Sequence, residues 1–194
     1  LMAGHDPEAK SYFDGMYNML KISPSSSRTF NKKTSTPKNN GLFSWVIPEN
    51  NDAKKLDESV TGSDIDIAYA LIMADNQWGS EGAINYIGEA KQIIDSILKY
   101  EIHPINITTL GDWHMSSDEF ILGTCIKDWA PANFRLFQKF TNNKRWINLI
   151  DNIYNDMETI NRKYNKKFYG KSTGLLPDYA DRVSRINREI KPVA

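Results

Sequence analysis

Apolar residues recur along most of this chain with helical spacing, and they define predicted helices of two kinds. Over residues 64–74 they cover every side of the predicted helix, so we expect this helix to be surrounded by protein. The next helix, over about 83–100, has a single apolar stripe and a polar opposite side. That stripe consists of Ile84, Ile87, Ala90, Ile94 and Ile97.

The same order returns further along the chain. Residues 131–140 form a short, aromatic-rich helix that we expect to be buried, and residues 144–164 form a long amphipathic one. A buried helix followed by an amphipathic helix, twice over, is typical of an inner and an outer ring of helices. A plain helical bundle is the alternative, because hydrophobic pattern alone fixes topology poorly. No useful alternating runs appear, so the pattern predicts an all-α fold.

The chain before residue 64 is less regular. Asp6 can cap a first helix, Pro7 suits its first position, and apolar residues continue at helical spacing to Leu20. Residues 23–40 are rich in Ser, Thr, Pro and Lys and predict a long loop. Residues 42–47 are apolar and predict either a brief strand or a packed loop.

Charge and composition exclude several classes of function. The 24 Lys and Arg balance 24 Asp and Glu, so no net charge favours nucleic acid or an anionic membrane. No apolar run approaches the ~20 residues of a membrane span. The single Cys125 excludes an internal disulfide and a multi-cysteine metal site, and the three histidines lie far apart. We therefore predict no metal and no cofactor, and one domain over residues 1–194.

The start of the 64–74 helix is the best candidate for a site, because a hydroxyl-rich, acidic turn leads directly into it. This region resembles the signature of glycoside hydrolase family 8. The corresponding residues are Val60-Thr61-Gly62-Ser63-Asp64, Ile67-Ala68-Tyr69-Ala70, Trp78, Leu110-Gly111-Asp112-Trp113, Asp128-Trp129, Phe134-Arg135 and Thr173-Gly174-Leu175. In the first of these segments Thr61 and Asp64 fit the signature, and Val60, Gly62 and Ser63 depart from it. Upstream, Gly4-His5-Asp6-Pro7 and Phe43-Ser44-Trp45 look like segments of the Bacillus-type endoglucanases, lichenases and chitosanases.

The resemblance implies a six-hairpin α/α-barrel, of which this chain would form only part. It also implies an inverting endo-β-1,4-glycanase that acts on cellulose, mixed-linkage β-glucan or chitosan. The substrate-binding residues would lie at the N-terminal ends of the inner helices. By resemblance they are Trp45, Thr61, Asp64, Asp112, Trp113, Asp128 and Trp129.

Four of these residues also have a purely structural interpretation. Asp64 could cap its helix instead of binding sugar, and one Asp could do both. Trp45, Trp113 and Trp129 could be core aromatics instead of stacking platforms for pyranose rings. We assign Trp78 and Trp146 to packing.

Inversion needs two carboxyl groups, an acid that protonates the leaving oxygen and a base that activates water. The resemblance places the acid in a Glu-Gly-x-Gly-Tyr-Gly segment before Leu1, and the base on a later helix or insertion. We therefore assign no catalytic residue within this chain. Gly62 stands where the signature has a sugar-contacting Asp. A non-catalytic glycan-binding or partner-binding remnant is the alternative function.

The predicted partner is a β-1,4-linked oligo- or polysaccharide. The resemblance also implies secretion, although we find no signal peptide in these residues. An open ring would expose the sides of helices such as 64–74, so self-association or a complementing chain is a further expectation.

Overall fold

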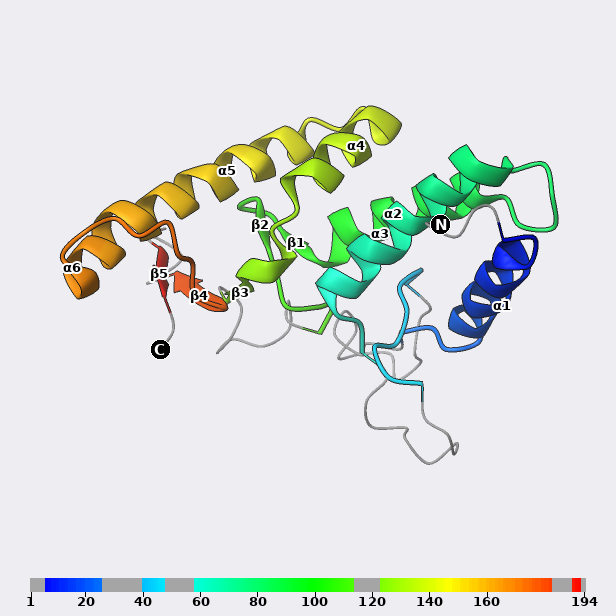
Figure 1. Ribbon diagram of the computed structural model, residues 1–194, viewed down its shortest axis with the longest axis horizontal. Coiled ribbons are helices and arrows are strands. Elements are labelled where there is room, and N and C mark those ends of the chain that lie inside the picture. Colours follow the sequence, from blue (N-terminus) through cyan, green and yellow to red (C-terminus); the bar gives the residue numbers. More distant parts are fainter. Residues whose placement is uncertain (1–5, 26–39, 48–57, 114–122, 183–189, 193–194) are drawn as a thin grey trace. The chain divides into compact units, whose positions relative to one another are not determined.

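The computed structural model of the protein (Figure 1) describes residues 6–25, 40–47, 58–113, 123–182 and 190–192. The chain divides into two compact units, which are described separately. Unit 1 comprises Leu1–Tyr100 and Gly111–Trp113, and unit 2 comprises Glu101–Leu110 and His114–Ala194. Most of the loop predicted over 23–40 lies outside the described residues, as do His5 and His114. The prediction of one domain over 1–194 stays a prediction.

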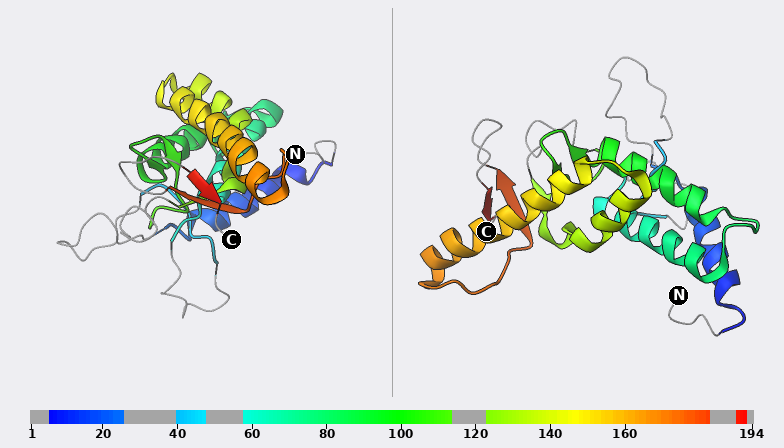
Figure 2. Two further views of the ribbon diagram at one scale, coloured as in Figure 1. Left: turned by 90° about the vertical axis from the view of Figure 1, so that its left-hand side faces the viewer. Right: turned by 90° about the horizontal axis from the view of Figure 1, so that it is seen from above.

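Unit 1 is built on two long helices that pack along each other, α2 (Thr61–Trp78) and α3 (Tyr86–Tyr100) (Figure 2). A shorter helix, α1 (Ala9–Lys21), precedes them. Gly79 ends α2 with φ of 71°, a left-handed backbone value that glycine adopts without strain. The core of this unit consists mainly of Ile65, Ala68, Leu71, Ile72, Ala90, Ile93, Ile94 and Ile97.

The prediction that protein surrounds α2 on every side is wrong for this structure. Ser63, Asp66, Tyr69 and Asn76 are exposed along one side of the helix. Tyr69 retains 39% of its accessible surface. A helix that is apolar all round needs neighbours all round, and the described part of unit 1 supplies them on only part of its circumference.

Unit 2 contains the remaining helices and all the named strands. The hairpin of β1 (Ile102–His103) and β2 (Ile107–Thr108) is antiparallel. The first helices of unit 2 are α4 (Pro131–Thr141) and α5 (Arg145–Thr159). Helix α5 continues through a π-helical turn, η4 (Ile160–Asn165), into the short helix α6 (Lys166–Tyr169). A second antiparallel sheet has the order β3 (Thr124–Cys125), β4 (Tyr179–Arg182), β5 (Ile190–Pro192).

The core of unit 2 is aromatic. Trp146 stacks on Phe134 with ring centroids 5.5 Å apart and meets Phe137 edge-on at 5.4 Å. All three rings are fully buried. The packing role of Trp146 and the amphipathic stripe of the 144–164 helix are therefore confirmed. The 131–140 helix is amphipathic instead of buried, because only Phe134 and Phe137 on α4 are inaccessible to solvent.

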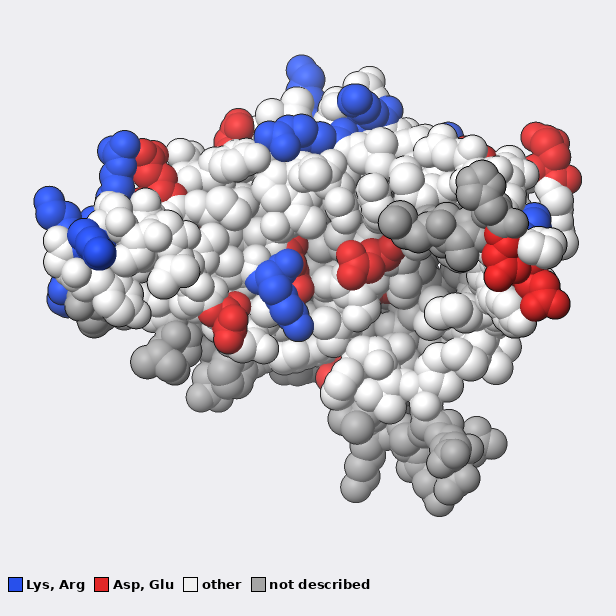
Figure 3. Space-filling model, viewed as in Figure 1, with Lys and Arg blue, Asp and Glu red and all other residues white. Residues whose placement is uncertain are grey.

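The fold is mainly helical, as the pattern predicts, and its strands are at most four residues long. Within the described ranges, no helix is both long enough and apolar enough to cross a membrane. Figure 3 shows acidic and basic side chains interspersed with uncharged surface, in keeping with the absence of net charge.

Candidate functional site

Segments from distant parts of unit 1 are bonded to one another near the start of α2. Ser25 N donates to Leu42 O at 2.8 Å, and Ser44 N donates to Ser23 O at 2.9 Å. Trp45 N donates to Glu58 O at 3.0 Å. Residues 42–47 are therefore a packed loop with one isolated bridge, Phe43 to Pro24, and not a strand of any length.

Asp112 joins these segments through its carboxylate. Ser25 Oγ and Asn40 Nδ2 each donate to Asp112 Oδ2 at 2.5 Å, and Ser59 N donates to Oδ1 at 3.0 Å. The backbone N of Asp112 in turn donates to Ser59 Oγ at 3.1 Å. The Asp112 side chain is buried, and both of its oxygens accept hydrogen bonds from other residues of the chain. This arrangement favours a positioning role for the carboxylate.

Gly111 allows residues 111–113 to approach this network closely. A Cβ atom at this position would lie 2.2 Å from the carbonyl oxygen of Ser59 and 2.6 Å from Nε1 of Trp113. Any other residue would push the two segments apart. The glycine of the Leu110-Gly111-Asp112-Trp113 motif is thus the sequence signal for a close approach that the pattern analysis did not use.

Thr61 and Asp64 occupy the first turn of α2, and both side chains are buried. The capping interpretation of Asp64 is wrong, because α2 begins at Thr61 and its N-cap is Val60, without a side-chain cap. Asp64 Oδ1 instead accepts a hydrogen bond from Phe43 N at 3.3 Å. Thr61 Oγ1 makes no hydrogen bond within the described part of the chain. A buried hydroxyl of this kind calls for a polar partner.

Trp45 is the most accessible aromatic residue among the predicted site residues. Its side chain retains 54% of its accessible surface, although its backbone N–H is hydrogen-bonded to the carbonyl oxygen of Glu58. Next to it, Ser44 Oγ donates to Val46 O at 2.8 Å and forms a local turn. Trp113 is half-buried. Trp45 is therefore an exposed indole on an ordered backbone, the geometry that stacking on a sugar ring requires.

Asp128 and Trp129 lie in unit 2 and are both buried. Trp129 Nε1 donates to Thr124 Oγ1 at 3.1 Å, and that hydroxyl is also 2.5 Å from Thr108 Oγ1. The surroundings of Trp129 favour a packing role. Beside it, Cys125 is buried, and burial together with the nearby Asp128 carboxylate raises the pKa of its thiol. This thiol therefore behaves as a small hydrophobe at neutral pH.

Asp178 is a carboxylate outside the set of site residues predicted from the sequence. It is exposed, and its backbone carbonyl accepts a hydrogen bond from Ile126 N at 2.9 Å, which places it beside the segment of Asp128. It follows closely on the Thr173-Gly174-Leu175 motif. An acidic residue three positions after a family motif was the available signal.

Two asparagines from the π-helical turn hold the motif that precedes Asp178. Asn165 Nδ2 donates to Thr173 Oγ1 and to Leu175 O, each at 2.8 Å. Gly174 N donates to Asn161 Oδ1 at 2.8 Å. A π-helical turn changes the side-chain register of a helix and is frequent at functional sites. Here it brings two amide side chains to one short loop.

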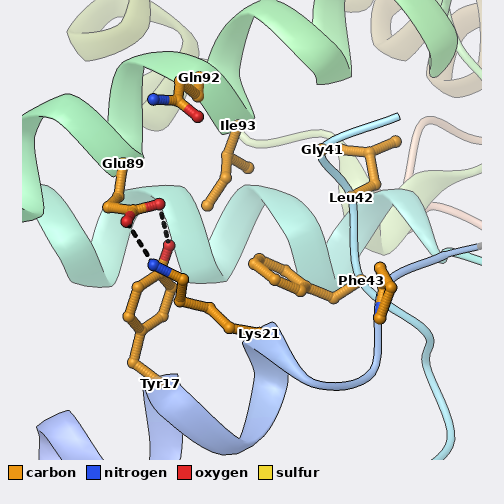
Figure 4. Close-up of a pocket in the computed structure, with 9 residues that line it drawn as sticks. Tyr17, Lys21, Gly41, Leu42, Phe43, Glu89, Gln92 and Ile93 are labelled. Atoms are coloured by element: carbon orange, nitrogen blue, oxygen red, sulfur yellow. Dashed lines mark hydrogen bonds and ion pairs between the residues drawn. The ribbon is translucent and has the colours of Figure 1, made fainter. Parts of the chain in front are cut away.

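A pocket of about 240 Å³ lies between α1, α3 and residues 41–43 (Figure 4). Glu89 faces into it and accepts hydrogen bonds from Tyr17 Oη at 2.8 Å and Lys21 Nζ at 2.6 Å. Burial, and then the Glu89 carboxylate, raise the pKa of Tyr17. None of the residues predicted from the sequence as site residues lines this pocket.

The structure thus groups five of the predicted residues in unit 1 and two in unit 2. Trp45, Thr61, Asp64, Asp112 and Trp113 belong to unit 1. Asp128 and Trp129 belong to unit 2, together with Asp178. Among the residues that the structure describes, no cluster of three or more His, Cys, Asp or Glu could hold a metal ion.

Comparison with known proteins assigns a family to this arrangement. The sequence model of Glycosyl hydrolases family 8 matches residues 8–183. An endoglucanase of Bacillus sp. (strain KSM-330) is 36% identical over 180 residues, which are 92% of this chain and 35% of that protein. A beta-glucanase of Niallia circulans is 37% identical over 182 residues, 92% of this chain and 40% of that protein.

The solved structures agree. The apo structure of a beta-1,3-1,4-glucanase from Paenibacillus sp. X4 superimposes with a TM-score of 0.82 at 32% identity, covering 98% of this chain and 45% of that one. The family 8 endoglucanase Cel10 of Klebsiella pneumoniae, at 19% identity and a TM-score of 0.70, shares the fold. This chain spans less than half the length of the Bacillus, Niallia and Paenibacillus relatives and 55% of the Klebsiella structure. It belongs to glycosyl hydrolases family 8 and forms part of that family's helical barrel.

Proposed function

We propose that this chain forms the β-glucan-binding part of a family 8 hydrolase domain, and that the whole protein is an inverting endo-β-1,4-glycanase. The observation that carries the proposal is the family match over residues 8–183, together with 36–37% identity to an endoglucanase and a beta-glucanase. The proposed substrates are cellulose, mixed-linkage β-glucan or chitosan. Because such polymers do not cross membranes, a protein that acts on them would be secreted.

The residues of unit 1 suggest how a glucan chain would be held. Trp45 offers an exposed aromatic face for a pyranose ring, and such a face contributes without requiring a fixed hydroxyl pattern. Thr61 and Asp64 at the start of α2 would supply polar groups from a site already shielded from water. Asp112 would act indirectly, by holding residues 58–60 against residues 111–113.

Hydrolysis with inversion requires an acid and a base about 6.5–9.5 Å apart, with a water molecule between the base and the sugar. Asp178 is an exposed carboxylate at the end of a loop fixed by Asn161 and Asn165, so it is our candidate for the base. The acid is expected in the Glu-Gly-x-Gly-Tyr-Gly segment that the family resemblance implies. We assign no residue of this chain to that role.

A second candidate function is glycan binding without catalysis. Gly62 supports it, because glycine offers no carboxylate where the family signature has one. The internal hydrogen bonds of Asp112 support it as well, since that carboxylate is engaged within the fold. Under this alternative, Trp45 would still stack on sugar.

Calorimetric titration of the purified chain with cellohexaose and with mixed-linkage glucan oligosaccharides tests both candidates, paired with a reducing-sugar assay on the polymers. We expect binding that Trp45→Ala weakens by roughly tenfold, the size of one lost stacking contact, while Tyr154→Ala on α5 leaves it unchanged. Because the acid is not assigned within this chain, the hydrolysis assay uses the Paenibacillus sp. X4 glucanase with its matched part replaced by this chain. Hydrolysis that Asp178→Asn abolishes would support the enzyme, and binding without hydrolysis by that hybrid would support the second candidate. Absence of binding would contradict both.

A further inference from the structure

The pocket between α1, α3 and residues 41–43 has an apolar wall (Figure 4). Leu42, Phe43 and Ile93 line it, and all three side chains are buried. The volume of the pocket, about 240 Å³, is below the ~300–1,000 Å³ that is typical of sites for drug-sized ligands. Its size and its wall therefore suit a single small ring with an apolar face.

Two charged side chains are held in place beside this wall. Glu89 Oε1 accepts a hydrogen bond from Lys21 Nζ at 2.6 Å, and Glu89 Oε2 accepts one from Tyr17 Oη at 2.8 Å. The Lys21 ammonium also lies over the Tyr17 ring, 5.6 Å from its centroid. These contacts order both charged groups before a ligand arrives, and such preorganisation lowers the entropic cost of binding.

The ion pair retains hydrogen-bonding capacity for a ligand. An ammonium carries three donors, and each carboxylate oxygen carries two lone pairs, so the bond between Lys21 and Glu89 uses only part of what the two groups offer. Their side chains keep 45% and 26% of their accessible surface, so both can be reached from solvent. The exposed amide of Gln92 also lines the pocket and adds a donor and an acceptor.

We propose that this pocket binds one neutral pyranose ring through two adjacent hydroxyl groups. One hydroxyl accepts a hydrogen bond from Lys21 Nζ, its neighbour donates to the Glu89 carboxylate, and the apolar face of the ring lies on the wall of the pocket. Both hydrogen bonds involve an ionised group and are stronger than neutral ones. Because the two charges cancel, the pocket does not favour a charged ligand, whereas a neutral diol uses both groups without separating them.

The same pyranose chemistry is available from two sources, a free monosaccharide and the end of a glucan chain. The inference goes beyond the proposed function, since none of the residues assigned to glucan binding lines this pocket and no hydrolysis is required. It rests on contacts within unit 1 alone.

Titration of the full chain with methyl β-D-glucoside, followed by the amide signals in two-dimensional NMR spectra, tests the site. The chain carries Trp45→Ala, so that the exposed indole does not contribute. We expect saturable shifts at the residues that line the pocket. Lys21→Met removes a donor while Tyr17 still bonds to Glu89, and it should weaken binding at least about tenfold, the size of a lost charge-assisted hydrogen bond.

Lys91→Met is the matched control, because Lys91 is an exposed lysine of α3 that does not line the pocket, and it should leave the affinity unchanged. Gln92→Ala keeps the proposal testable if Lys21→Met unfolds the chain, as circular dichroism would show. It should weaken binding about fivefold, the size of one neutral hydrogen bond. Asp95→Ala, at another exposed position of α3, is its control.

Comparison of ligands tests the recognition of two hydroxyls. Cyclohexanol, a ring with one hydroxyl, should bind at least about tenfold more weakly than the glucoside. Equal binding of cyclohexanol, or tighter binding of acetate or ethylammonium at the same residues, would overturn the proposed recognition. Absence of saturable shifts in the pocket, or an affinity that Lys21→Met and Gln92→Ala both leave unchanged, would overturn the site itself.

Cellotriose distinguishes the two sources of the sugar. Binding as tight as that of the glucoside would identify a chain end as the ligand, and exclusion of the trisaccharide would identify a free monosaccharide. The proposed function is reported separately, by cellohexaose binding to the chain that retains Trp45. Failure of that titration would leave the glucoside result standing, and the reverse also holds.

Discussion

Helices α1 and α5 are both amphipathic, yet they use their two sides in opposite ways. Helix α5 buries Trp146, Leu149, Ile150 and Ile153, and only scattered apolar residues such as Ile147 remain exposed. Helix α1 joins α3 through hydroxyl, ammonium and carboxylate groups and exposes Tyr12, Met16 and Met19. The same kind of pattern thus marks a buried core in one unit and an exposed apolar side in the other.

The difference shows what an apolar stripe in a sequence means. It predicts that a helix will be covered, and it does not say by what. In α5 the covering residues lie on α4, the preceding helix, and on β2. In α1 the described residues of unit 1 meet the polar side and the neighbouring Phe13, whose ring lies 5.5 Å from Trp78 and 5.7 Å from Tyr86. The predictions that follow test this contrast, from the largest expected effect to the smallest.

Trp146→Ala should have the largest effect on stability. It removes a fully buried indole that stacks on Phe134 and meets Phe137, so the free energy of unfolding should fall by about 3–5 kcal/mol. Trp146→Phe should cost much less, since it retains an aromatic ring and the indole Nε1 makes no hydrogen bond within the described part of the chain. Urea denaturation monitored by circular dichroism measures both. Equal losses for the two variants would contradict the stacking argument.

Asp112→Ala should destabilise unit 1 by about 3 kcal/mol, because it leaves the buried donors of Ser25 and Ser59 and the half-buried amide of Asn40 without their acceptor. The exposed Asp66→Asn is the control and should change stability by less than about 0.5 kcal/mol. Chemical denaturation gives both values. If Asp112→Ala proves neutral, the carboxylate does not hold the segments at the start of α2.

Tyr17 should make the attachment of α1 sensitive to alkali. Burial and Glu89 raise the pKa of Tyr17 in the folded protein, whereas in the unfolded chain it titrates near 10. Its contribution to stability is complete below that pH and declines as the pH rises further, because the unfolded state then releases a proton that the folded state retains.

Thermal unfolding between pH 8 and pH 11.5 tests this prediction. The midpoint should fall less steeply above pH 10 in Tyr17→Phe than in the parent protein. Tyr154→Phe on the exposed side of α5 is the control and should follow the parent curve. Parallel curves for the parent and for Tyr17→Phe would show that the pKa of Tyr17 is the same in the folded and unfolded states.

Met16→Gln should have the smallest effect on the isolated chain. Its side chain is 66% exposed, so the free energy of unfolding should change by less than about 0.5 kcal/mol. The corresponding change on α5, Ile153→Gln, should cost more than about 2 kcal/mol, since Ile153 is buried. Denaturant titration compares the two. A large loss for Met16→Gln would mean that this side of α1 is already covered.

Much of the helical fold could be predicted from spacing alone. The stripes over 83–100 and 144–164 appear as α3 and as the continuous α5, η4 and α6, because their neighbours lie within the same unit. The burial of α2 on all sides could not be predicted correctly, since it depends on which helices surround it. The short sheets escaped prediction because strands of two to four residues leave no usable alternation.

For the candidate site, too, some features could be predicted from the sequence and others could not. The motifs located the segments that meet near the start of α2, and Gly111 marked a close approach. They did not show that the carboxylate of Asp112 would be used internally, because its partners Ser25 and Asn40 are distant in sequence. Nor did they separate Trp45, which is exposed, from Trp129, which is packed and donates to Thr124.

The sequence by itself determined that this chain is helical, that it resembles family 8, and which residues carry that resemblance. Local spacing and short motifs are sufficient for these conclusions, because they depend on neighbours along the chain. Only the tertiary structure decided which carboxylates are buried, which tryptophan is accessible, that Asp178 lies beside the segment of Asp128, and that α1 leaves Tyr12, Met16 and Met19 exposed. These properties depend on contacts between residues far apart in sequence, and such contacts exist only once the chain has folded.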